Sequence, residues 1–307
     1  MPLAEFCLSG GFMYKEYEEC TLCPRECRVN RNRGEKGICS QTSNVKIGRN
    51  ALHYWEEPCI SGEKGSGTVF FSGCSLRCVY CQNYNLGRGN VGKEIEESEL
   101  SDIFIKLQED GAHNINLVTG DHFAPHIKDA VIKARKDGLT IPVLLNTGGY
   151  VSTKTLDILK DIIDIYLVDF KYMNPQIAKN YSNASDYPEV VKKAICKMVE
   201  ITGDPVYDKD GMLQKGVVVR HLCLPSHTDD SKNIIRYLFE TYGTKIIYSI
   251  MRQFTPIKNI EKYPHLNRAL TEEEYDRVVD YCIEIGIEDA YIQDGECASE
   301  SFIPEFR

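Results

Sequence analysis

The chain lacks several features that would assign it to a familiar class. No stretch of its 307 residues approaches the roughly 20 consecutive apolar residues that a membrane span needs. The N-terminus has neither a basic start nor an apolar run of signal-peptide length, so we expect a cytoplasmic protein with no membrane partner. The glycines at 62, 65 and 67 lack the G-K-[ST] ending of a phosphate loop. No H-E-x-x-H pattern or Ser–His–Asp order stands out, so hydrolytic catalysis has no support.

Positive charge is scarce in the chain as a whole. The net charge of −9 argues against nucleic acid as a partner. Residues 25–49 are nevertheless basic, with seven Lys and Arg side chains against two acids, whereas residues 271–307 hold twelve acids and two arginines. The simplest interpretation is that both segments are solvated surfaces. Alternatively, the arginines of the basic segment donate to cysteine thiolates or dock a partner.

Cysteine, in contrast, is plentiful. The chain has thirteen cysteines, and seven of them fall in two tight groups. In a chain of this length without a signal peptide, such grouping indicates metal or cluster ligation rather than disulfides. We expect most of the scattered cysteines to pack as small apolar residues. These are Cys7, Cys59, Cys196, Cys223, Cys282 and Cys297.

The first group lies in residues 68–86, TVFFSGCSLRCVYCQNYNL. A β-prone apolar run leads into Cys74, Cys78 and Cys81, spaced C-x3-C-x2-C, with Tyr80 just before the last cysteine. Three thiolates on one short loop can hold three irons of a 4Fe–4S cluster. The fourth iron is then open, and an open metal position is where a substrate can bind and react.

The second group comprises Cys20, Cys23, Cys27 and Cys39, spaced C-x2-C-x3-C-x11-C. Proline and glycine mark this segment as a loop, and it has too few apolar residues to fold without a metal. Zinc and an iron–sulfur cluster both fit four thiolates, and the spacing does not separate them. Four unligated thiols are the remaining alternative.

From residue 68 onward, strand and helix patterns alternate. This alternation indicates βαβ units and a parallel sheet, most simply an incomplete (β/α)6 barrel. A doubly wound open sheet is the alternative. We expect an N-terminal extension over 1–60, with two short strands around residues 48–50, and the barrel over 61–307. Predicted strands cover 68–71, 113–119, 141–146, 163–170, 216–222 and 245–251, and predicted helices cover 94–108, 123–136, 152–160, 187–201, 229–242 and 271–285.

Polar residues stand where these strands end. In either fold, reactive groups lie at the carboxyl ends of the strands, and the three-cysteine loop follows the first strand directly. A packed core would not explain so many polar side chains at successive strand ends. They include Thr119, Asp121, His122, Asn146, Asp169, Lys171, Arg220 and His221. His122 and His221 are candidate acid–base groups, with hydrogen-bonded packing as the alternative.

The motifs together resemble those of radical S-adenosylmethionine (radical SAM) enzymes, in the branch similar to pyruvate formate-lyase activating enzymes. The matching stretches include CTLCPRECRVNR, GSGTVFFSGCSLRCVYCQN, DIYLVDFKYM, VRHLCLP, MRQFTP and the terminal FIPEF. The resemblance implies that the open iron is chelated by the amino and carboxylate groups of the methionine moiety of SAM. It also implies an activity: the reduced cluster cleaves SAM, and the resulting 5′-deoxyadenosyl radical abstracts hydrogen from a substrate.

The resemblance further assigns cofactor contacts. Asp169 and Lys171 are expected to contact SAM, and Arg220 to face the methionine carboxylate. Thr119-Gly120-Asp121 stands where activating enzymes have a Gly-Gly-Glu run that contacts the methionine amino group. Further expected contacts are Tyr80, Asn83, Asn146 and His221.

The resemblance leaves the identity of the substrate open. The substrate is a glycine of a partner protein if the chain is a true activating enzyme, and otherwise another peptide or a small molecule. We expect an electron donor such as flavodoxin or ferredoxin. A non-catalytic iron–sulfur electron carrier is the alternative from another class, but a carrier normally ligates every iron with protein thiolates.

Overall fold

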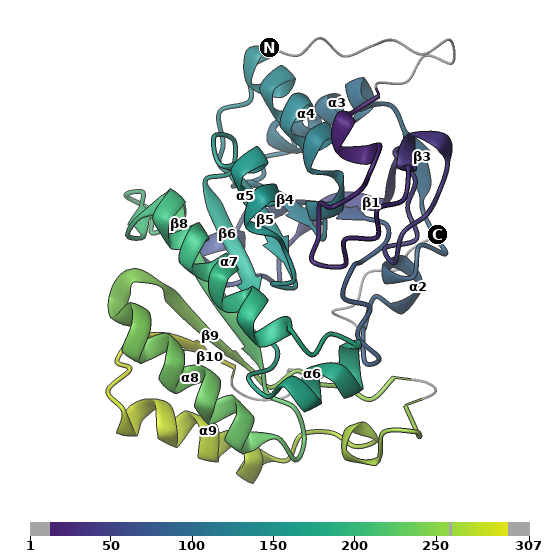
Figure 1. Cartoon of the computed structure of the whole chain (residues 1–307). Coiled ribbons are helices and arrows are strands. Elements are labelled where there is room, and N and C mark those ends of the chain that lie inside the picture. Colours follow the sequence, from purple (N-terminus) through teal and green to yellow (C-terminus); the bar gives the residue numbers. More distant parts are fainter. Residues whose placement is uncertain (1–12, 258–259, 294–307) are drawn as a thin grey trace.

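The computed structural model describes residues 13–257 and 260–293 (Figure 1). Cys7, Cys297 and the FIPEF run lie outside the described residues. The described part is built on a ten-stranded sheet, in the order β10-β9-β8-β6-β5-β4-β2-β1-β3, with β7 pairing beside β8. The strands are β1 (Val45–His53), β2 (Ser66–Phe71), β3 (Lys93–Ile95), β4 (Ile115–Val118), β5 (Val143–Thr147), β6 (Ile165–Asp169), β7 (Val206–Tyr207), β8 (Leu213–Leu222), β9 (Ile247–Met251) and β10 (Ala290–Ile292).

The parallel part of the sheet is wound in one direction. From β2 to β10, each successive parallel strand adds beside the previous one, and the order never reverses. A doubly wound sheet would contain a reversal, because its strand order switches direction at its centre. The six predicted strands, each followed by a helix, are therefore confirmed as an open (β/α)6 partial barrel. β10 extends it with a short seventh strand that the sequence pattern did not predict.

The antiparallel edge differs from the prediction. The two short strands expected around residues 48–50 are one strand, β1, which pairs antiparallel with β2 and on its other side with β3. The pairing with β2 shifts register between Ile47 and Arg49. A bulge at Gly48 thus absorbs the turn-like sequence while pairing continues on both sides. Residues 94 and 95, predicted as the start of a helix, belong to β3 instead.

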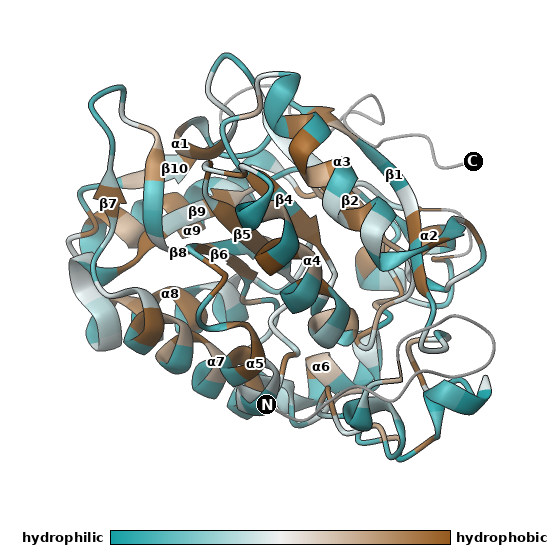
Figure 2. Ribbon diagram, turned by 90° about the horizontal axis from the view of Figure 1, so that it is seen from above, coloured by the Kyte–Doolittle hydropathy of each residue, from teal (hydrophilic) through white to brown (hydrophobic). Residues whose placement is uncertain are grey.

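The longer helices cover one face of the sheet. Figure 2 shows that their hydrophobic sides turn toward the strands, while their outer sides are hydrophilic. The Ser152 side chain caps one helix, and Thr271 and Glu274 form a capping box at the start of another. The helices are α1 (Pro58–Ser61), α2 (Tyr84–Gly87), α3 (Glu97–Glu109), α4 (Ala124–Lys136), α5 (Thr153–Leu159), α6 (Pro175–Ser182), α7 (Tyr187–Thr202), α8 (Thr228–Tyr242) and α9 (Glu272–Glu284). None of the helices in the described residues is long and apolar enough to cross a bilayer.

The two faces of the sheet bury different side chains, because successive strand residues point to opposite faces. Toward the helices, residues such as Val69, Leu117 and Val219 belong to one large apolar core. On the inner face, Leu167 and Val218 belong to a smaller apolar cluster with Cys59 and Ile60 of α1. The short helix α1 therefore closes one part of the inner face. On the inner face, the residues nearer the carboxyl ends of the strands carry polar groups.

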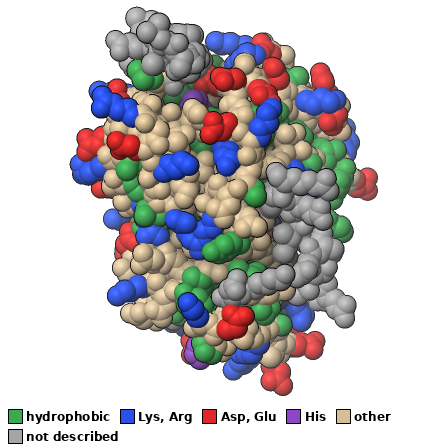
Figure 3. Space-filling view, turned by 90° about the vertical axis from the view of Figure 1, so that its right-hand side faces the viewer, with side chains coloured by type: hydrophobic (Ala, Val, Ile, Leu, Met, Phe, Trp, Pro, Cys, Tyr) green, Lys and Arg blue, Asp and Glu red, His purple; other side chains and the backbone are tan. Residues whose placement is uncertain are grey.

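The N-terminal segment has little regular structure. It contains two 3-10 turns, Lys15–Tyr17 and Arg31–Arg33. It lies on the same side of the molecule as β3 and α2 (Figure 1). Figure 3 shows this side, with basic side chains grouped near the middle of the face.

Candidate active site

A cavity of about 440 Å³ opens at the carboxyl ends of the parallel strands. Its volume falls within the roughly 300–1,000 Å³ of small-molecule sites. Consecutive strands each contribute a residue near their last position to its wall. These residues are Phe70, Val118, Asn146, Asp169, Arg220, Ser249 and Ile292. The predicted location of the reactive groups is therefore the location of this cavity.

The three cysteines after β2 all lie on the cavity wall. Burial, and then the neighbouring charge of Cys78, raise the pKa of Cys74 to about 11 and that of Cys81 to about 12. Ser182 Oγ donates a hydrogen bond to Cys78 Sγ at 3.1 Å. Buried thiolates that repel each other are stabilised when they bind cations, so this wall fits a metal cluster.

Glycine shapes the cysteine loop at two points. Gly73 has a φ of 88°, and a Cβ there would collide with the carbonyl oxygen of Cys39. Gly87 of α2 also lies on the wall, where an added Cβ would meet Cys81 Sγ at 3.6 Å. The loop therefore packs tightly against the N-terminal segment at Gly73, and Gly87 places no side chain beside the Cys81 sulfur.

Tyr80 is held in an aromatic cluster. Its ring makes edge contacts with Tyr172, Tyr181 and Phe254, with centroids 5.9–6.4 Å apart. The side chain is buried and still reaches the cavity wall, as does Asn83. The aromatic residue before the last cysteine thus fixes the loop on the barrel as well as lining the site.

At the end of β6, a charged pair faces the cavity. Lys171 Nζ donates to Asp169 Oδ2 at 2.6 Å. Burial lowers the pKa of Lys171, but the Asp169 carboxylate and then Tyr80 raise it, and the net shift is well above the usual value. Tyr187 fixes the turn between them, because its hydroxyl donates to the Asp169 carbonyl at 2.7 Å and accepts from the Lys171 amide at 2.9 Å.

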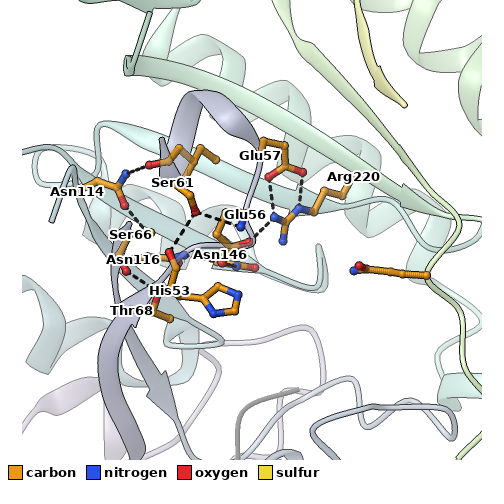
Figure 4. Close-up of polar contacts among 12 residues, drawn as sticks. His53, Glu56, Glu57, Ser61, Ser66, Thr68, Asn114, Asn116, Asn146 and Arg220 are labelled. Carbon is orange, nitrogen blue, oxygen red and sulfur yellow. Dashed lines mark hydrogen bonds and ion pairs between the residues drawn. The ribbon is translucent and has the colours of Figure 1, made fainter. Parts of the chain in front are cut away.

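Arg220 projects from β8 into the same cavity, where it is paired with two carboxylates (Figure 4). Its Nε and Nη2 donate to the two oxygens of Glu57 at 2.7 and 2.6 Å, and Nη2 also donates to Glu56. Burial lowers the pKa of Arg220, yet Glu56 and Glu57 raise it well above its usual value. These hydrogen bonds to Glu56 and Glu57 use Nε and Nη2 but not Nη1.

The carboxylates belong to a polar network on the inner face of the sheet (Figure 4). Asn116 and Asn146 donate to Glu56 Oε1 at 2.8 and 3.4 Å. Sequence reasoning missed Glu56, Glu57 and the cavity residue His53, because this stretch follows β1 and precedes α1 without a motif. A Glu-Glu pair before a proline is by itself a surface pattern, and only the fold turns it inward.

Three predicted cofactor contacts do not line the cavity: Gly120, Asp121 and His221. His221 follows Arg220 on β8 and therefore points to the opposite face. Its Nδ1 lies 2.8 Å from the Phe170 carbonyl, and burial lowers its pKa to about 4. Asp121 is buried in a 3-10 turn after β4, beside Thr147, and burial raises its pKa to about 6.

His122 likewise lies off the wall. Its Nε2 lies 2.9 Å from the Ser72 carbonyl, and burial lowers the pKa to about 3. Both histidines are neutral at physiological pH and are bonded to backbone carbonyls. The packing interpretation therefore fits them better than acid–base catalysis. The other predicted residues of the barrel line the cavity: Cys74, Cys78, Tyr80, Cys81, Asn83, Thr119, Asn146, Asp169, Lys171 and Arg220.

The four N-terminal cysteines lie off this wall. Cys20, Cys23 and Cys39 are buried, and Cys27 is half-buried. Burial raises the pKa of Cys23 to about 12, and the charges of Cys39, Asp121 and Cys20 act on the same thiol. The second group is thus a separate, enclosed cysteine set that does not face the cavity.

The sequence profile of the radical SAM superfamily matches residues 68–238, which include the cysteine loop and most of the cavity wall. The chain belongs to the radical SAM superfamily. Members of this superfamily are enzymes that use a 4Fe–4S cluster and SAM. The predicted resemblance is confirmed at this level.

Two curated proteins are similar to this chain in sequence. An uncharacterized protein of Methanocaldococcus jannaschii is 28% identical over 86% of this chain and 74% of its own length. A pyruvate formate-lyase 1-activating enzyme of Escherichia coli is 27% identical over 39% of this chain and 50% of its own.

Among solved structures, the Streptococcus suis protein SuiB bound to S-adenosylmethionine is similar at 10% identity and a TM-score of 0.46. The alignment covers 72% of this chain. This chain spans about half the length of that protein, and half the length of the Escherichia coli relative.

Proposed function

We propose that this radical SAM enzyme acts as an activating-enzyme-like protein, abstracting hydrogen from a glycine of a partner polypeptide. The observation that carries the proposal is the cavity, in which three cysteines and a paired Lys171–Asp169 face one space. When bound, the cluster and SAM supply a 5′-deoxyadenosyl radical. The residues of the chain bind, orient and shield these groups.

Each wall residue has a task in this proposal. Cys74, Cys78 and Cys81 hold three irons and leave the fourth open. Lys171 and the Nη1 end of Arg220 provide positive charge for a carboxylate, because salt bridges to Asp169 and Glu57 hold both cations in place. Further polar contacts to SAM come from Tyr80, Asn83, Thr119, Asn146 and Asp169.

A polypeptide substrate is supported by the mouth of the cavity. Trp55 and Tyr84 line it, although their surfaces are 65% and 45% exposed. Large aromatic side chains at an open rim are typical of surfaces that contact other proteins. The resemblance to pyruvate formate-lyase activating enzymes points the same way. A small electron-transfer protein such as flavodoxin or ferredoxin is the proposed source of the electron.

Deuterium transfer tests the substrate class. Cells that carry this protein are grown on α-deuterated glycine, and their extract is separated into a protein and a small-molecule fraction. The purified, reconstituted enzyme is then reduced with SAM and each fraction. Deuterium in 5′-deoxyadenosine with the protein fraction, accompanied by a glycyl-radical EPR doublet, is the expected result.

Deuterium that comes only from small molecules would overturn the glycine assignment. To test whether the mouth of the cavity contacts the polypeptide, the experiment is repeated with Trp55→Ala. A variant at Tyr207, an aromatic residue that is 43% exposed and does not line the cavity, serves as the control. Transfer from protein falls in the first variant and stays unchanged in the second if the rim contacts the polypeptide.

A further inference from the structure

Short-range contacts bring the four N-terminal cysteines together. The Cys20 amide donates to the Val29 carbonyl at 3.1 Å, which places Cys20 beside the chain that follows Cys27. The Ile38 amide donates to Cys27 Sγ at 3.3 Å, which places that sulfur beside the residue before Cys39. A turn from Cys23 to residue 26 closes the group. An amide that donates to sulfur is a bond suited to a thiolate.

A buried cation stands beside these sulfurs. Arg31 is fully buried, and its Nη1 lies 4.0 Å from Cys20 Sγ. Its other hydrogen bonds go to the carbonyls of Thr42 and His122, and Tyr17 covers its planar face. Within the described residues, Arg31 forms no ion pair with a carboxylate. A buried charge without a counter-charge is strongly unfavourable, so the anion must come from the cysteines.

The spacing of the sulfurs bears on which group they hold. A tetrahedral zinc ion keeps its sulfurs about 2.3 Å from one point. Across the described residues, no three or more Cys, His, Asp or Glu side chains are gathered closely enough for a single ion. In an iron–sulfur cluster each thiolate binds its own iron at a different corner, so the sulfurs stand farther apart. The same holds for the cavity cysteines, in the loop that belongs to a cluster-binding family: they too form no single-ion group among the described residues.

We propose that Cys20, Cys23, Cys27 and Cys39 hold a second, fully cysteine-ligated iron–sulfur cluster, and that Arg31 is its buried counter-cation. Four thiolates leave no iron open, so this cluster does not bind substrate. It lies next to the cavity loop, because Arg25 donates to the Ser75 carbonyl at 3.0 Å and Arg77 to the Ile38 carbonyl at 3.2 Å. The assignment does not depend on the proposed substrate.

Iron analysis of a protein without the cavity ligands tests the site. The full-length Cys74/Cys78/Cys81→Ala protein is reconstituted anaerobically with iron and sulfide. We expect it to keep about two or about four irons per chain, as a 2Fe–2S or a 4Fe–4S cluster requires, and an EPR signal on reduction. Adding Cys20→Ala removes both, whereas adding Cys196→Ala, at an exposed cysteine outside both groups, leaves them unchanged. A triple variant that binds no metal, or about one zinc per chain, would overturn the assignment.

Arg31 is tested by a reduction potential measured in the same triple variant. A cation beside the cluster stabilises its reduced, more negative form. Arg31→Met therefore shifts the potential to a more negative value, and Arg31→Lys restores part of the shift. Arg28→Met, at an exposed arginine of the same segment, is the control. Equal potentials for the Arg31→Met and Arg28→Met proteins would contradict the role of Arg31 as counter-cation.

Discussion

The two cysteine groups differ in what surrounds them. Cys74, Cys78 and Cys81 line a cavity, and the arginine at that cavity, Arg220, is paired with two carboxylates, Glu56 and Glu57. The N-terminal group is enclosed, and its arginine has no carboxylate partner in the described part of the chain. An open group whose arginine already has carboxylate partners suits a site where a zwitterionic ligand enters. A closed group with an unbalanced cation suits a cluster that stays in place.

Removal of a cavity cysteine is the largest expected effect. Cys78→Ala leaves two thiolates on the loop, so SAM cleavage falls by about three orders of magnitude or more. Anaerobic 5′-deoxyadenosine formation measures the loss, with Cys196→Ala as the control. Residual activity within tenfold of the wild type would contradict the ligand assignment.

The second prediction concerns Arg220, which differs from Arg31 in having carboxylate partners among the described residues. Arg220→Met leaves Glu56 and Glu57 as buried, unpaired carboxylates, so the free energy of unfolding falls by roughly 3–5 kcal/mol. Urea unfolding measures this change. The exposed Arg236→Met is the control, with an expected change below about 0.5 kcal/mol. An Arg220 variant as stable as the control would show that the pair is not structurally important.

The pH dependence of stability tests whether His221 is buried behind the cavity wall. The pKa of His221 is lowered to about 4, below its unfolded value of 6.5, so the unfolded state takes up the proton first. Stability is present above pH 6.5 and is lost as the pH falls toward 4. Between pH 7 and 5 the wild type loses about 2 kcal/mol more than His221→Gln. Identical pH profiles of unfolding would contradict the buried, neutral histidine.

The smallest expected effect concerns the hydrogen bond from Ser182 to Cys78. Ser182→Ala removes a donor that stabilises the more negative, reduced state, so the cavity cluster shifts to a more negative potential by an amount on the order of tens of millivolts. EPR-monitored titration measures the shift. Ser231→Ala, which removes a hydroxyl bonded to the His227 carbonyl, provides the control. A shift of the same size in both variants would rule out a specific effect.

The sequence predicted the repeating parts of the fold and the residues that a short motif carries. Strand–helix alternation gave the six parallel strands, and cysteine spacing gave the loop on the cavity wall. Arg220 and His221 show where this reasoning stops, because adjacent strand residues face opposite sides and the pattern alone does not say which faces inward. Glu56 and Glu57 lie 164 and 163 positions from Arg220, a tertiary contact that no local pattern encodes.

SAM binding at the two cysteine groups tests the central distinction most directly. EPR spectra of reduced protein are recorded with SAM labelled with ¹⁵N at the methionine amino group. In the Cys20/Cys23/Cys27/Cys39→Ala protein, the account predicts that SAM shifts the spectrum and adds ¹⁵N hyperfine coupling. In the Cys74/Cys78/Cys81→Ala protein, it predicts an iron–sulfur signal that SAM leaves unchanged. Hyperfine coupling that persists without the cavity cysteines, or is absent when they are intact, would contradict the account.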